Sequence, residues 1–373
     1  MNLHVFNDIH GFTLNLTVKR FEDKNVLDNN TFINLTQKTK YTNSHVIYLE
    51  RSLRDFRRFL KTTSDVRKVT FYPFDSVAAF FLKELRKLYP DVEVGWAFWS
   101  YEYYHRPELY LSALDPFSLN YYKKQNNFAV RSKRRLITAA KKILSRPVYN
   151  KQLLEESYQF ITRFHSFLPA DFKSIKNISE TCRSYQLSFL SVEEITAGIA
   201  GEKKMTNEIM IGHAGSIAGN HAEIIQELAE IKINNKFLIP IEYGDENYIK
   251  EIRSMAMSLL GDNVQFLEQR MSKEEYFKRL SNVGLAIFNF KTQEGLGNIF
   301  FLLWNGTKIF LREESSAYKQ FKEWGLSIFS VENDLNRAGL AHLLTEKEAA
   351  ENRRIIEEIF SESKVESYWK LLM

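Results

Sequence analysis

Two glycine-rich turns in the second half of the sequence have the residue types and spacing of an anion-binding site. In the first, within Glu208 to His221, a short apolar run ends at Gly212, and Gly215 and Gly219 lead into an amphipathic segment. The second is Glu294-Gly295-Leu296-Gly297-Asn298. Glycine lets the backbone approach a phosphate closely, and the first N–H groups of a helix have no intrahelical partner. Strand, glycine turn and helix N-terminus in this order predict phosphate binding by main-chain amides.

Several side chains beside these turns are candidates for binding a nucleotide. His213, inside the first turn, and His221, at the start of the helix, could donate charge-assisted hydrogen bonds to phosphate. Tyr243 and Gly244 follow the next apolar run and could border the base or the phosphates. Glu294 could accept hydrogen bonds from ribose hydroxyls. The structural alternatives are glycines that only turn a strand into a helix, histidines packed in a core, an exposed loop glutamate and a plain helix cap.

Length and composition predict a folded protein with more than one domain. The chain has 373 residues, of which 44% are hydrophobic and 26% charged, with a net charge of +5. The single cysteine, Cys182, excludes an intrachain disulfide and suits the cytoplasm. Asp8 and His10 interrupt the opening apolar run, unlike a signal peptide, and no apolar segment approaches the roughly 20 residues that span a bilayer. We therefore expect a cytoplasmic protein.

Apolar runs alternate with amphipathic segments along most of the chain, which predicts mainly parallel sheets with helices on their faces. The alternation is cleanest in the second half, where residues 191–345 predict a five-strand, doubly wound α/β domain. Residues 1–190 predict another α/β domain, with a helix expected over residues 158–167. Residues 346–373 predict a helical tail that could cross back to the N-terminal domain.

A basic stretch over residues 116–154 contains no acidic residue. Basic side chains, among them Lys133, Arg134 and Arg135, and apolar side chains recur at helical spacing and can occupy opposite faces. Such a helix can lie on an anionic membrane surface, and we expect it on the inner face of the plasma membrane. The alternatives are a helix docked on its own domain and a nucleic-acid partner. We do not expect nucleic acid, because no aromatic stacking motif is recognisable here.

Four segments resemble a known family of bacterial transferases. The turn IGHAGSIAGNH at Ile211–His221 is similar to the family pattern VGNSGDxSNxH, and PIEYGDENYIKEI at Pro240–Ile252 is similar to a strand end followed by NxxYIxxV. Leu285–Ser315 resembles YFIFxRQQGIGTLxLLIQAGIPxVLNREN, and Val94–Tyr104 resembles FFWHIWGADLY. The family is that of the 4-acetamido-4,6-dideoxygalactose transferases. These enzymes move N-acetylfucosamine from its dTDP-linked donor to a polyprenyl-linked disaccharide during synthesis of the enterobacterial common antigen.

The resemblance implies a GT-B glycosyltransferase, with two Rossmann-like doubly wound domains facing each other across a cleft. It also implies an acceptor-binding domain over residues 1–190 and a nucleotide-sugar-binding domain over residues 191–345. The implied partners are a dTDP- or UDP-linked sugar donor and a polyprenyl-diphosphate-linked acceptor. His213 and Ser216 depart from the family pattern, as do Ser100 and Glu102, so the identity of the donor does not follow from the resemblance.

A diphosphate leaving group requires cations, oriented N–H donors or a metal to compensate its charge. Metal-dependent transferases commonly carry an Asp-x-Asp pair, because Mg²⁺ prefers carboxylate oxygens, and the sequence contains no such pair. We therefore expect no metal and no cofactor beyond the nucleotide sugar. The N-termini of the helices after Gly219-Asn220 and after Gly295 are expected to stabilise the diphosphate.

An inverting transfer needs a base for the acceptor hydroxyl. Glu102 is the first candidate, because it follows an apolar strand and the resemblance places an acidic residue there; Asp8 and His10, after the first strand, are alternatives. Trp96 and Trp99 could stack on the acceptor sugar, although burial is the commoner fate of tryptophan. The basic stretch would hold the polyprenyl diphosphate at the membrane.

The leading hypothesis is a metal-independent glycosyltransferase acting on a lipid-linked acceptor. The alternatives are a nucleotide-sugar epimerase of the same architecture and a non-catalytic nucleotide-binding protein. A dehydrogenase is disfavoured, because Gly212, Gly215 and Gly219 do not reproduce the G-x-G-x-x-G spacing of dinucleotide-binding turns.

Overall fold

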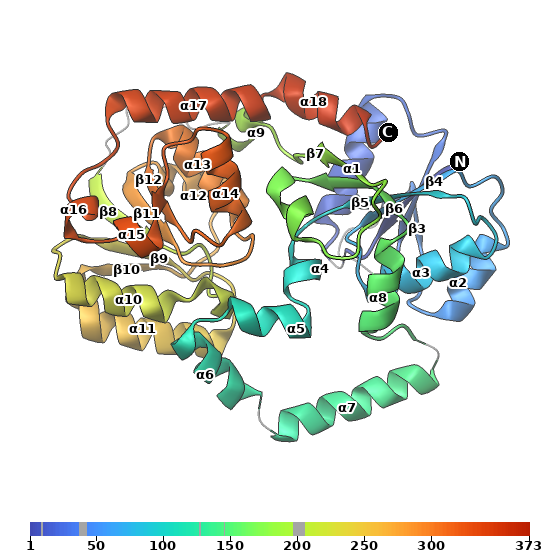
Figure 1. Cartoon of the computed structure of the whole chain (residues 1–373), viewed down its shortest axis with the longest axis horizontal. Helices are drawn as coiled ribbons and strands as arrows, with labels where there is room; N and C mark the ends of the chain where they lie inside the picture. Colours follow the sequence, from blue (N-terminus) through green and yellow to red (C-terminus); the bar gives the residue numbers. More distant parts are fainter. Residues whose placement is uncertain (9, 37–42, 127, 145, 197–205) are drawn as a thin grey trace. The chain divides into compact units, whose positions relative to one another are not determined.

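The computed structural model describes residues 1–8, 10–36, 43–126, 128–144, 146–196 and 206–373, which form two compact units (Figure 1). Unit 1 comprises Met1–Tyr103, Asn127–Phe189 and Glu366–Met373, and unit 2 comprises Tyr104–Asn126 and Leu190–Val365. Each unit is therefore discontinuous in sequence. Residues 104–126 belong to unit 2, and residues 366–373, the end of the predicted helical tail, belong to unit 1.

Unit 1 contains a parallel sheet of seven strands in the described residues, in the order β3-β2-β1-β4-β5-β6-β7. The strand order reverses between β1 and β4, because β1 pairs with β2 on one side and with β4 on the other. The strands are β1 (Asn2–Phe6), β2 (Asn30–Asn34), β3 (Val46–Tyr48), β4 (Lys68–Tyr72), β5 (Glu93–Ala97), β6 (Ile161–Ser166) and β7 (Arg183–Gln186).

The helices of unit 1 begin at polar capping residues where the sequence provides them. Ser52 accepts a hydrogen bond from the Asp55 amide at the start of α2, and Asp75 accepts two amides at the start of α3. The helices α2, α3 and α8 pack side by side (Figure 1). Unit 1 contains α1 (Phe12–Asp23), α2 (Leu53–Leu60), α3 (Ser76–Arg86), α7 (Phe128–Ile143), α8 (Lys151–Tyr158) and all but the last residue of α4 (Tyr101–Tyr104).

Unit 2 contains a parallel sheet of six strands in the described residues, in the order β10-β9-β8-β11-β12-β13. Here the order reverses at β8, which pairs with β9 on one side and β11 on the other. The strands are β8 (Thr206–Ile211), β9 (Phe237–Pro240), β10 (Val264–Leu267), β11 (Val283–Phe288), β12 (Lys308–Leu311) and β13 (Phe329–Ser330). The short β13 adds a strand to the five expected.

Helices cover both faces of this sheet, so unit 2 is doubly wound. The helices α10 and α11 pack together on one side, and α13 packs with α17 on the other (Figure 1). The helices are α5 (Pro107–Tyr110), α6 (Pro116–Gln125), α9 (Val192–Thr196), α10 (His221–Ile231), α11 (Glu246–Leu260), α12 (Lys273–Leu280), α13 (Leu296–Asn305), α14 (Ser316–Glu323), α15 (Val331–Asp334), α16 (Arg337–Leu340) and α17 (Glu346–Phe360). The last helix, α18 (Glu362–Lys370), contains residues of both units.

The predicted elements of the second half agree closely with the observed ones. The strands β8 to β12 alternate with helices, as the alternation of apolar runs and amphipathic segments predicts, and residues 346–360 form the helix α17. In the first half, the helix expected over residues 158–167 is wrong. The segment is the end of α8 followed by β6, whose Ile161, Thr162 and Phe164 suit a strand that pairs with β5.

Residues 104–126 are attached to the rest of unit 2 by a buried carboxylate. The Asp115 carboxylate lies 2.9 Å from Lys291 Nζ and 3.3 Å from an Arg312 nitrogen, and the Asp115 amide donates to the Asn220 side chain at 2.9 Å. Leu114 and Tyr121 of the same segment belong to the hydrophobic core of unit 2. Removing one partner of a buried ion pair lowers the stability of a protein by about 3–5 kcal/mol. Asp115 therefore fixes this segment in place.

The C-terminal residues of α18 complete the core of unit 1. Trp369 is 2% exposed, its indole N–H donates to the Ser188 carbonyl at 2.9 Å, and its ring contacts Phe21 and Phe189 edge to face. Across the described residues, no helix combines the length and the apolar composition that crossing a bilayer requires.

Candidate functional site

Both units bring polar side chains to the carboxyl edge of a parallel sheet, at the point where the strand order reverses. Open α/β sheets bind ligands at this point, because the connections leave β-strand ends in opposite directions and open a crevice. In unit 2 the point lies between β8 and β11, which are followed by the two glycine turns. In unit 1 it lies between β1 and β4, followed by Asn7 and Asp75.

The amides of the first glycine turn are already bonded within unit 2. Gly212 donates to the Ile287 carbonyl at 2.9 Å, Gly215 to the Tyr243 carbonyl at 2.7 Å and Gly219 to Ser216 at 3.0 Å. The first amide of α10, that of His221, donates to the Tyr248 hydroxyl at 3.2 Å, and residues 211–220 are buried except for Ser216. These four amides are therefore already paired within unit 2, so they favour the alternative in which the glycines of this turn only connect a strand to a helix.

The glycines of the first turn instead make room for an imidazole ring. A Cβ added to Gly212 would lie 2.2 Å from His221 Nε2, and one added to Gly219 would lie 2.4 Å from His221 Cε1. Gly212 also has a φ of +67°, which favours glycine. Neither ring nitrogen of His221 has a hydrogen-bond partner among the described residues, and burial, followed by the nearby His213, lowers its pKa to about 4. His221 is therefore a neutral, packed ring.

The second glycine turn is open where the first is closed. Gly295 starts α13 with a φ of +63° and no side-chain cap, and the first helical hydrogen bond in the helix runs from Ile299 N to Gly295 O. The N–H groups of Leu296, Gly297 and Asn298 precede that bond. Gly297 is exposed, with nothing within 4 Å of the position of a Cβ. The N-terminus of α13 is therefore the part of the two turns that can accept an anion.

A carboxylate and two histidines lie beside this helix start. Glu294 Oε1 is 3.6 Å from His105 Nε2. The buried His213 packs against Gly295, because a Cβ added to Gly295 would lie 2.8 Å from His213 Cγ. Burial raises the pKa of Glu294, but the histidines and Ser216 lower it more, and the net shift is downward. Burial lowers the pKa of His213. The site at neutral pH thus contains an ionised Glu294 beside a neutral His213.

The remaining donor-site candidates lie in neighbouring positions. Tyr243 is exposed after β9, and its carbonyl accepts the Gly215 amide. Gly244 approaches Gly215 so closely that a Cβ would meet the Gly215 carbonyl oxygen at 2.2 Å. Asn298 is not the N-cap of α13, because Gly295 has that position; its side chain donates to the Tyr276 hydroxyl at 3.2 Å.

In unit 1, Glu102 is a buried carboxyl group in α4, the short helix that follows β5. Its Oε1 accepts hydrogen bonds from Trp96 Nε1 and from the Trp99 amide, both at 2.9 Å, whereas Oε2 has no partner among the described residues. Burial is the main cause that raises its pKa to about 8, and Asp75 adds to the shift. An acid of this kind exchanges its proton near neutral pH, as a general base requires.

Asp8 and His10 have different surroundings. The Asp8 carboxylate accepts the amides of His10, Gly11 and Leu14 at 2.8–3.2 Å, so both of its oxygens stabilise the start of α1. The side chain of His10 is exposed. Asp8 is therefore a helix-capping residue, which weakens the alternative in which it acts as the base.

The two tryptophans after Val94 form part of the core and its edge. Trp96 is fully buried and contacts Phe74, Phe98, Tyr158 and Phe164, so it presents no face to an acceptor, contrary to expectation. Trp99 is partly buried against Phe167 and Phe189.

The basic stretch forms the helix α7, and its apolar residues are exposed. Leu136 is 73% exposed and Ile143 is 84% exposed, and Lys133 and Arg135 are exposed as well. The side chain of Arg134 lies outside the described part of the chain. The interpretation of this helix as docked on its own domain through its apolar face is therefore wrong for the described side chains.

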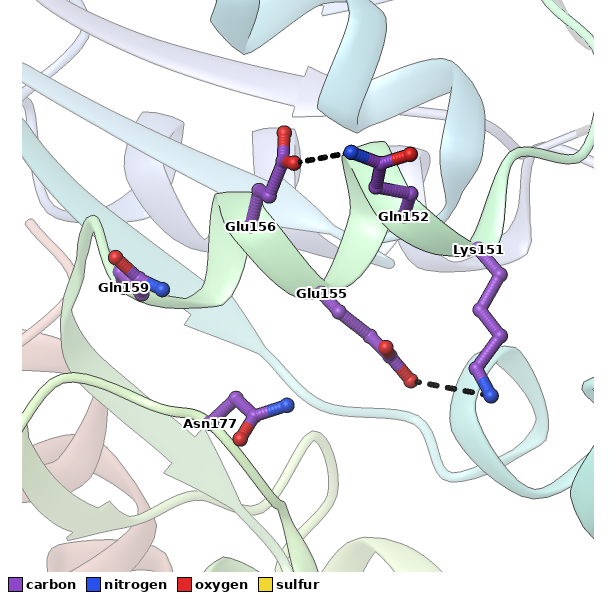
Figure 2. Close-up of a pocket in the computed structure, with 6 residues that line it drawn as sticks. All are labelled: Lys151, Gln152, Glu155, Glu156, Gln159 and Asn177. Atoms are coloured by element: carbon purple, nitrogen blue, oxygen red, sulfur yellow. Dashed lines mark hydrogen bonds and ion pairs between the residues drawn. The ribbon is translucent and has the colours of Figure 1, made fainter.

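Surface hollows occur away from the strand ends. One of about 400 Å³ lies along α8, where Gln152 donates to Glu156 and Lys151 pairs with Glu155 (Figure 2). Its charged groups are paired with each other on a single helix, so it does not resemble a substrate site. A hollow of about 870 Å³ lies between α2 and the end of α7, lined by Arg54, Arg58, Ile143 and other residues. Among the described residues, no group of three His, Cys, Asp or Glu side chains is placed to hold a metal ion.

Comparison with known families decides the class of this site. Residues 177–372, more than half of the chain, match the model of the family described as 4-alpha-L-fucosyltransferase, glycosyl transferase group 56. The chain belongs to this family. The matched range includes both glycine turns, Glu294 and α13, whereas Glu102 lies outside it. The group 56 protein is therefore a glycosyltransferase, as the family resemblance in the sequence implied.

Solved structures share the fold of this chain. The match with a sucrose-phosphate synthase from Thermosynechococcus elongatus covers 100% of this chain and 98% of that protein, with a TM-score of 0.62 and 10% identity. An Anabaena protein in complex with UDP and glucose covers 100% and 99%, with a TM-score of 0.59 and 11% identity. A trehalose-phosphate synthase (UDP-forming) from Burkholderia xenovorans covers 100% and 99%, with a TM-score of 0.57 and 10% identity. These likenesses confirm the predicted α/β GT-B fold of the group 56 protein.

Sequence reasoning missed residues that the fold brings to the two sites. In unit 1, Asn7 donates to Asp75 at 2.5 Å and accepts from Arg51 across the reversal point of the sheet. In unit 2, His105 lies against Glu294, which is far away in sequence. The position of His105 after an apolar strand gave a signal, but its partner depends on residues 104–126 belonging to unit 2.

We expect Gly212→Ala to destabilise unit 2 by about 2–5 kcal/mol, because the methyl group would be both strained at positive φ and forced into His221. Gly297→Ala is the matched control, with an expected effect between zero and a gain of about 1 kcal/mol, since its surroundings are open and it lies in a helix. Hydrogen exchange of β8 and α10 in both variants measures the difference. Equal protection in the two variants would contradict the packing described here.

Proposed function

We propose that the group 56 protein transfers a 4-amino- or 4-acetamido-deoxy hexose from a dTDP- or UDP-linked donor to a polyprenyl-diphosphate-linked saccharide. The reaction belongs to the synthesis of a cell-surface polysaccharide on the inner face of the plasma membrane, and it needs no divalent metal. The proposal rests on the N-terminus of α13, which lies beside Glu294 and two histidines at the point where the strand order of the sheet reverses. The family of the chain, glycosyl transferase group 56, supplies the reaction class.

The donor is bound by unit 2 in this proposal. The amides at Leu296, Gly297 and Asn298 receive the diphosphate, whose charge the helix N-terminus favours. These donors are already oriented before the sugar leaves, so they stabilise the developing charge with little reorganisation. The ionised Glu294 cannot accept an anion and instead accepts hydrogen bonds from hydroxyl groups of ribose or hexose. The metal-independent character rests on these amides and on the absence of an Asp-x-Asp pair from the sequence.

The acceptor is activated by unit 1. Glu102 takes the proton of the attacking hydroxyl at Oε2, which is buried in this structure and has no partner among the described residues. Its Oε1 keeps the hydrogen bonds from Trp96 and Trp99 that orient the group. Direct attack with this base inverts the anomeric centre. Asn7, Arg51 and Asp75 form a bonded group at the neighbouring strand ends, where they can bind sugar hydroxyls.

The helix α7 binds the lipid part of the acceptor in this proposal. From Lys133 to Leu144 every side chain that the structure describes is exposed, apolar and basic residues alike. Such a helix inserts its apolar residues at the acyl boundary while its cations face anionic headgroups. The hollow between α2 and the end of α7 places Arg54 next to Ile143, whereas Arg58 is paired there with Asp55 at 3.5 Å.

Nucleotide binding is the direct test of the proposal. We expect UDP, dTDP or both to bind the purified protein in calorimetry, and transfer to a polyprenyl-linked acceptor to continue in EDTA. Sugar epimerised in the absence of any acceptor would support the epimerase alternative, and binding without turnover would support a non-catalytic protein. Failure of UDP-, dTDP- and GDP-sugars to bind would reject the proposal.

We expect Glu102→Gln to lower kcat by about 10²–10⁴-fold, the usual contribution of a general base, with little change in nucleotide affinity. The amide oxygen of glutamine still accepts from Trp96 and Trp99, so the variant should fold. Because burial raises the pKa of Glu102 to about 8, kcat of the unaltered protein should rise with pH through that value. A Glu102→Gln enzyme with full activity and the same pH profile would show that another group is the base.

We expect charge reversal of Lys133, Arg134 and Arg135 to glutamate to release the protein from vesicles that contain anionic phospholipid, because each cation contributes about 1 kcal/mol near such a surface. Nucleotide affinity should not change. Reversal of the exposed Lys61, Lys83 and Lys176 alters net charge equally and serves as the control. Vesicle flotation of the two triple variants decides the matter, and equal binding of both would contradict a role for α7.

A further inference from the structure

His105 is an exposed histidine that the fold places against the carboxylate of the donor site. Its Nε2 is 3.6 Å from Glu294 Oε1, and its ring contacts Tyr110 edge to face with centroids 5.3 Å apart. The side chain of His105 is 45% exposed, whereas that of Glu294 is 12% exposed. The carboxylate is thus covered, and its partner remains in contact with solvent.

The position of His105 is fixed by contacts of its own segment. Asp115 is held by Lys291 and Arg312, the Glu223 carboxylate accepts the amides of Phe117 and Ser118, and the Tyr121 hydroxyl donates to Asp245 at 3.2 Å. These bonds attach residues 115–121 to unit 2 on the carboxyl side of α5. His105 is therefore presented to Glu294 by an anchored segment.

Glu294 has a second effect besides accepting hydroxyl hydrogen bonds. It immediately precedes Gly295, the N-cap of α13, and is therefore adjacent in the chain to the amides that the proposed function assigns to the diphosphate. Two anions repel each other, and the interaction is strong in a partly buried site. A cation beside Glu294 would offset that repulsion and leave the carboxylate in place.

The titratable groups that face Glu294 are His105, His213, His221, Tyr110 and Tyr243. Burial lowers the pKa of both buried histidines, so they are neutral near pH 7, and burial raises that of both tyrosines, so they are neutral as well. Histidine is the side chain that ordinarily changes charge between pH 5 and 8. His105 is the exposed histidine of this group.

We propose that His105 is a positioning residue for the donor, whose protonated form pairs with Glu294 and removes the repulsion between this carboxylate and the diphosphate. The inference rests on the proposed function, because it takes the N-terminus of α13 as the diphosphate site. The inference predicts tighter donor binding at the lower end of the range from pH 5 to 8 than at its upper end, because a histidine ordinarily changes its charge within that range.

The experiment compares the dissociation constants of UDP and dTDP by calorimetry at about pH 6 and about pH 8, on either side of the histidine range. It uses the unaltered protein, His105→Gln, which cannot be charged, and His105→Lys, which stays charged. His45→Gln is the matched control, because His45 is also exposed and lies 3.2 Å from a glutamate, Glu22, but belongs to unit 1. Protonation of the nucleotide itself is common to all four proteins and cancels in their comparison.

We expect nucleotide affinity to be lower at the higher pH in the unaltered protein and in His45→Gln. This loss should exceed the loss in His105→Gln by about twofold to fivefold, which is the contribution of a solvent-accessible ion pair. His105→Lys should keep its affinity at the higher pH. The same pH dependence in His105→Gln as in the unaltered protein would overturn the inference and leave the proposed function standing. No binding of either nucleotide to the unaltered protein would reject the proposed function and the inference together.

Discussion

The pairing of one buried carboxylate with two cations determines where a whole segment of this glycosyltransferase belongs. Residues 104–126 are preceded and followed in the chain by residues of unit 1, yet Asp115 binds Lys291 and Arg312 of unit 2. Two charged groups removed from water require each other, so neither cation can leave without a large loss of stability. His105 reaches Glu294 because Asp115 holds the segment that carries it.

Within each unit, the parallel sheet decides which residues can meet. All strands of such a sheet end at one edge, and the reversal of strand order opens a crevice at one place along it. In unit 2 the two turns at that place have different roles: the first is filled by the ring of His221, and the second leaves the amides of α13 accessible. In unit 1 the same geometry joins Asn7 to Asp75 and places Glu102 after a neighbouring strand.

Much of unit 2 could be predicted from the sequence, because apolar strands, caps and glycine turns follow local rules. The capping box at Ser272 and Glu275 and the bounds of α11 and α17 depend on residues close to each other in the chain. The openness of a glycine turn does not, since it depends on distant side chains. Gly212 and Gly295 look alike in sequence, yet the residues directly after Gly212 are buried, whereas Gly297, after Gly295, is exposed. The pairing of His105 with Glu294 likewise required the fold.

Local patterns were least informative where tertiary packing decides between helix and strand. β6 lies between β5 and β7 and is stabilised by both neighbours, which residues 161–166 do not reveal by themselves. Trp96 could equally have lain on a surface, until the surrounding rings showed it to be core.

The attachment of Trp369 to unit 1 has a consequence for the order in which the protein becomes structured during synthesis. The ribosome produces all of residues 190–365 before this tryptophan, so unit 2 can be completed while the interior of unit 1 still has a gap beside Phe21 and Phe189. Nascent chains generally acquire structure from their beginning. Here the domain translated first is the last to close, and its exposed aromatic interior is what a chaperone would encounter in the meantime.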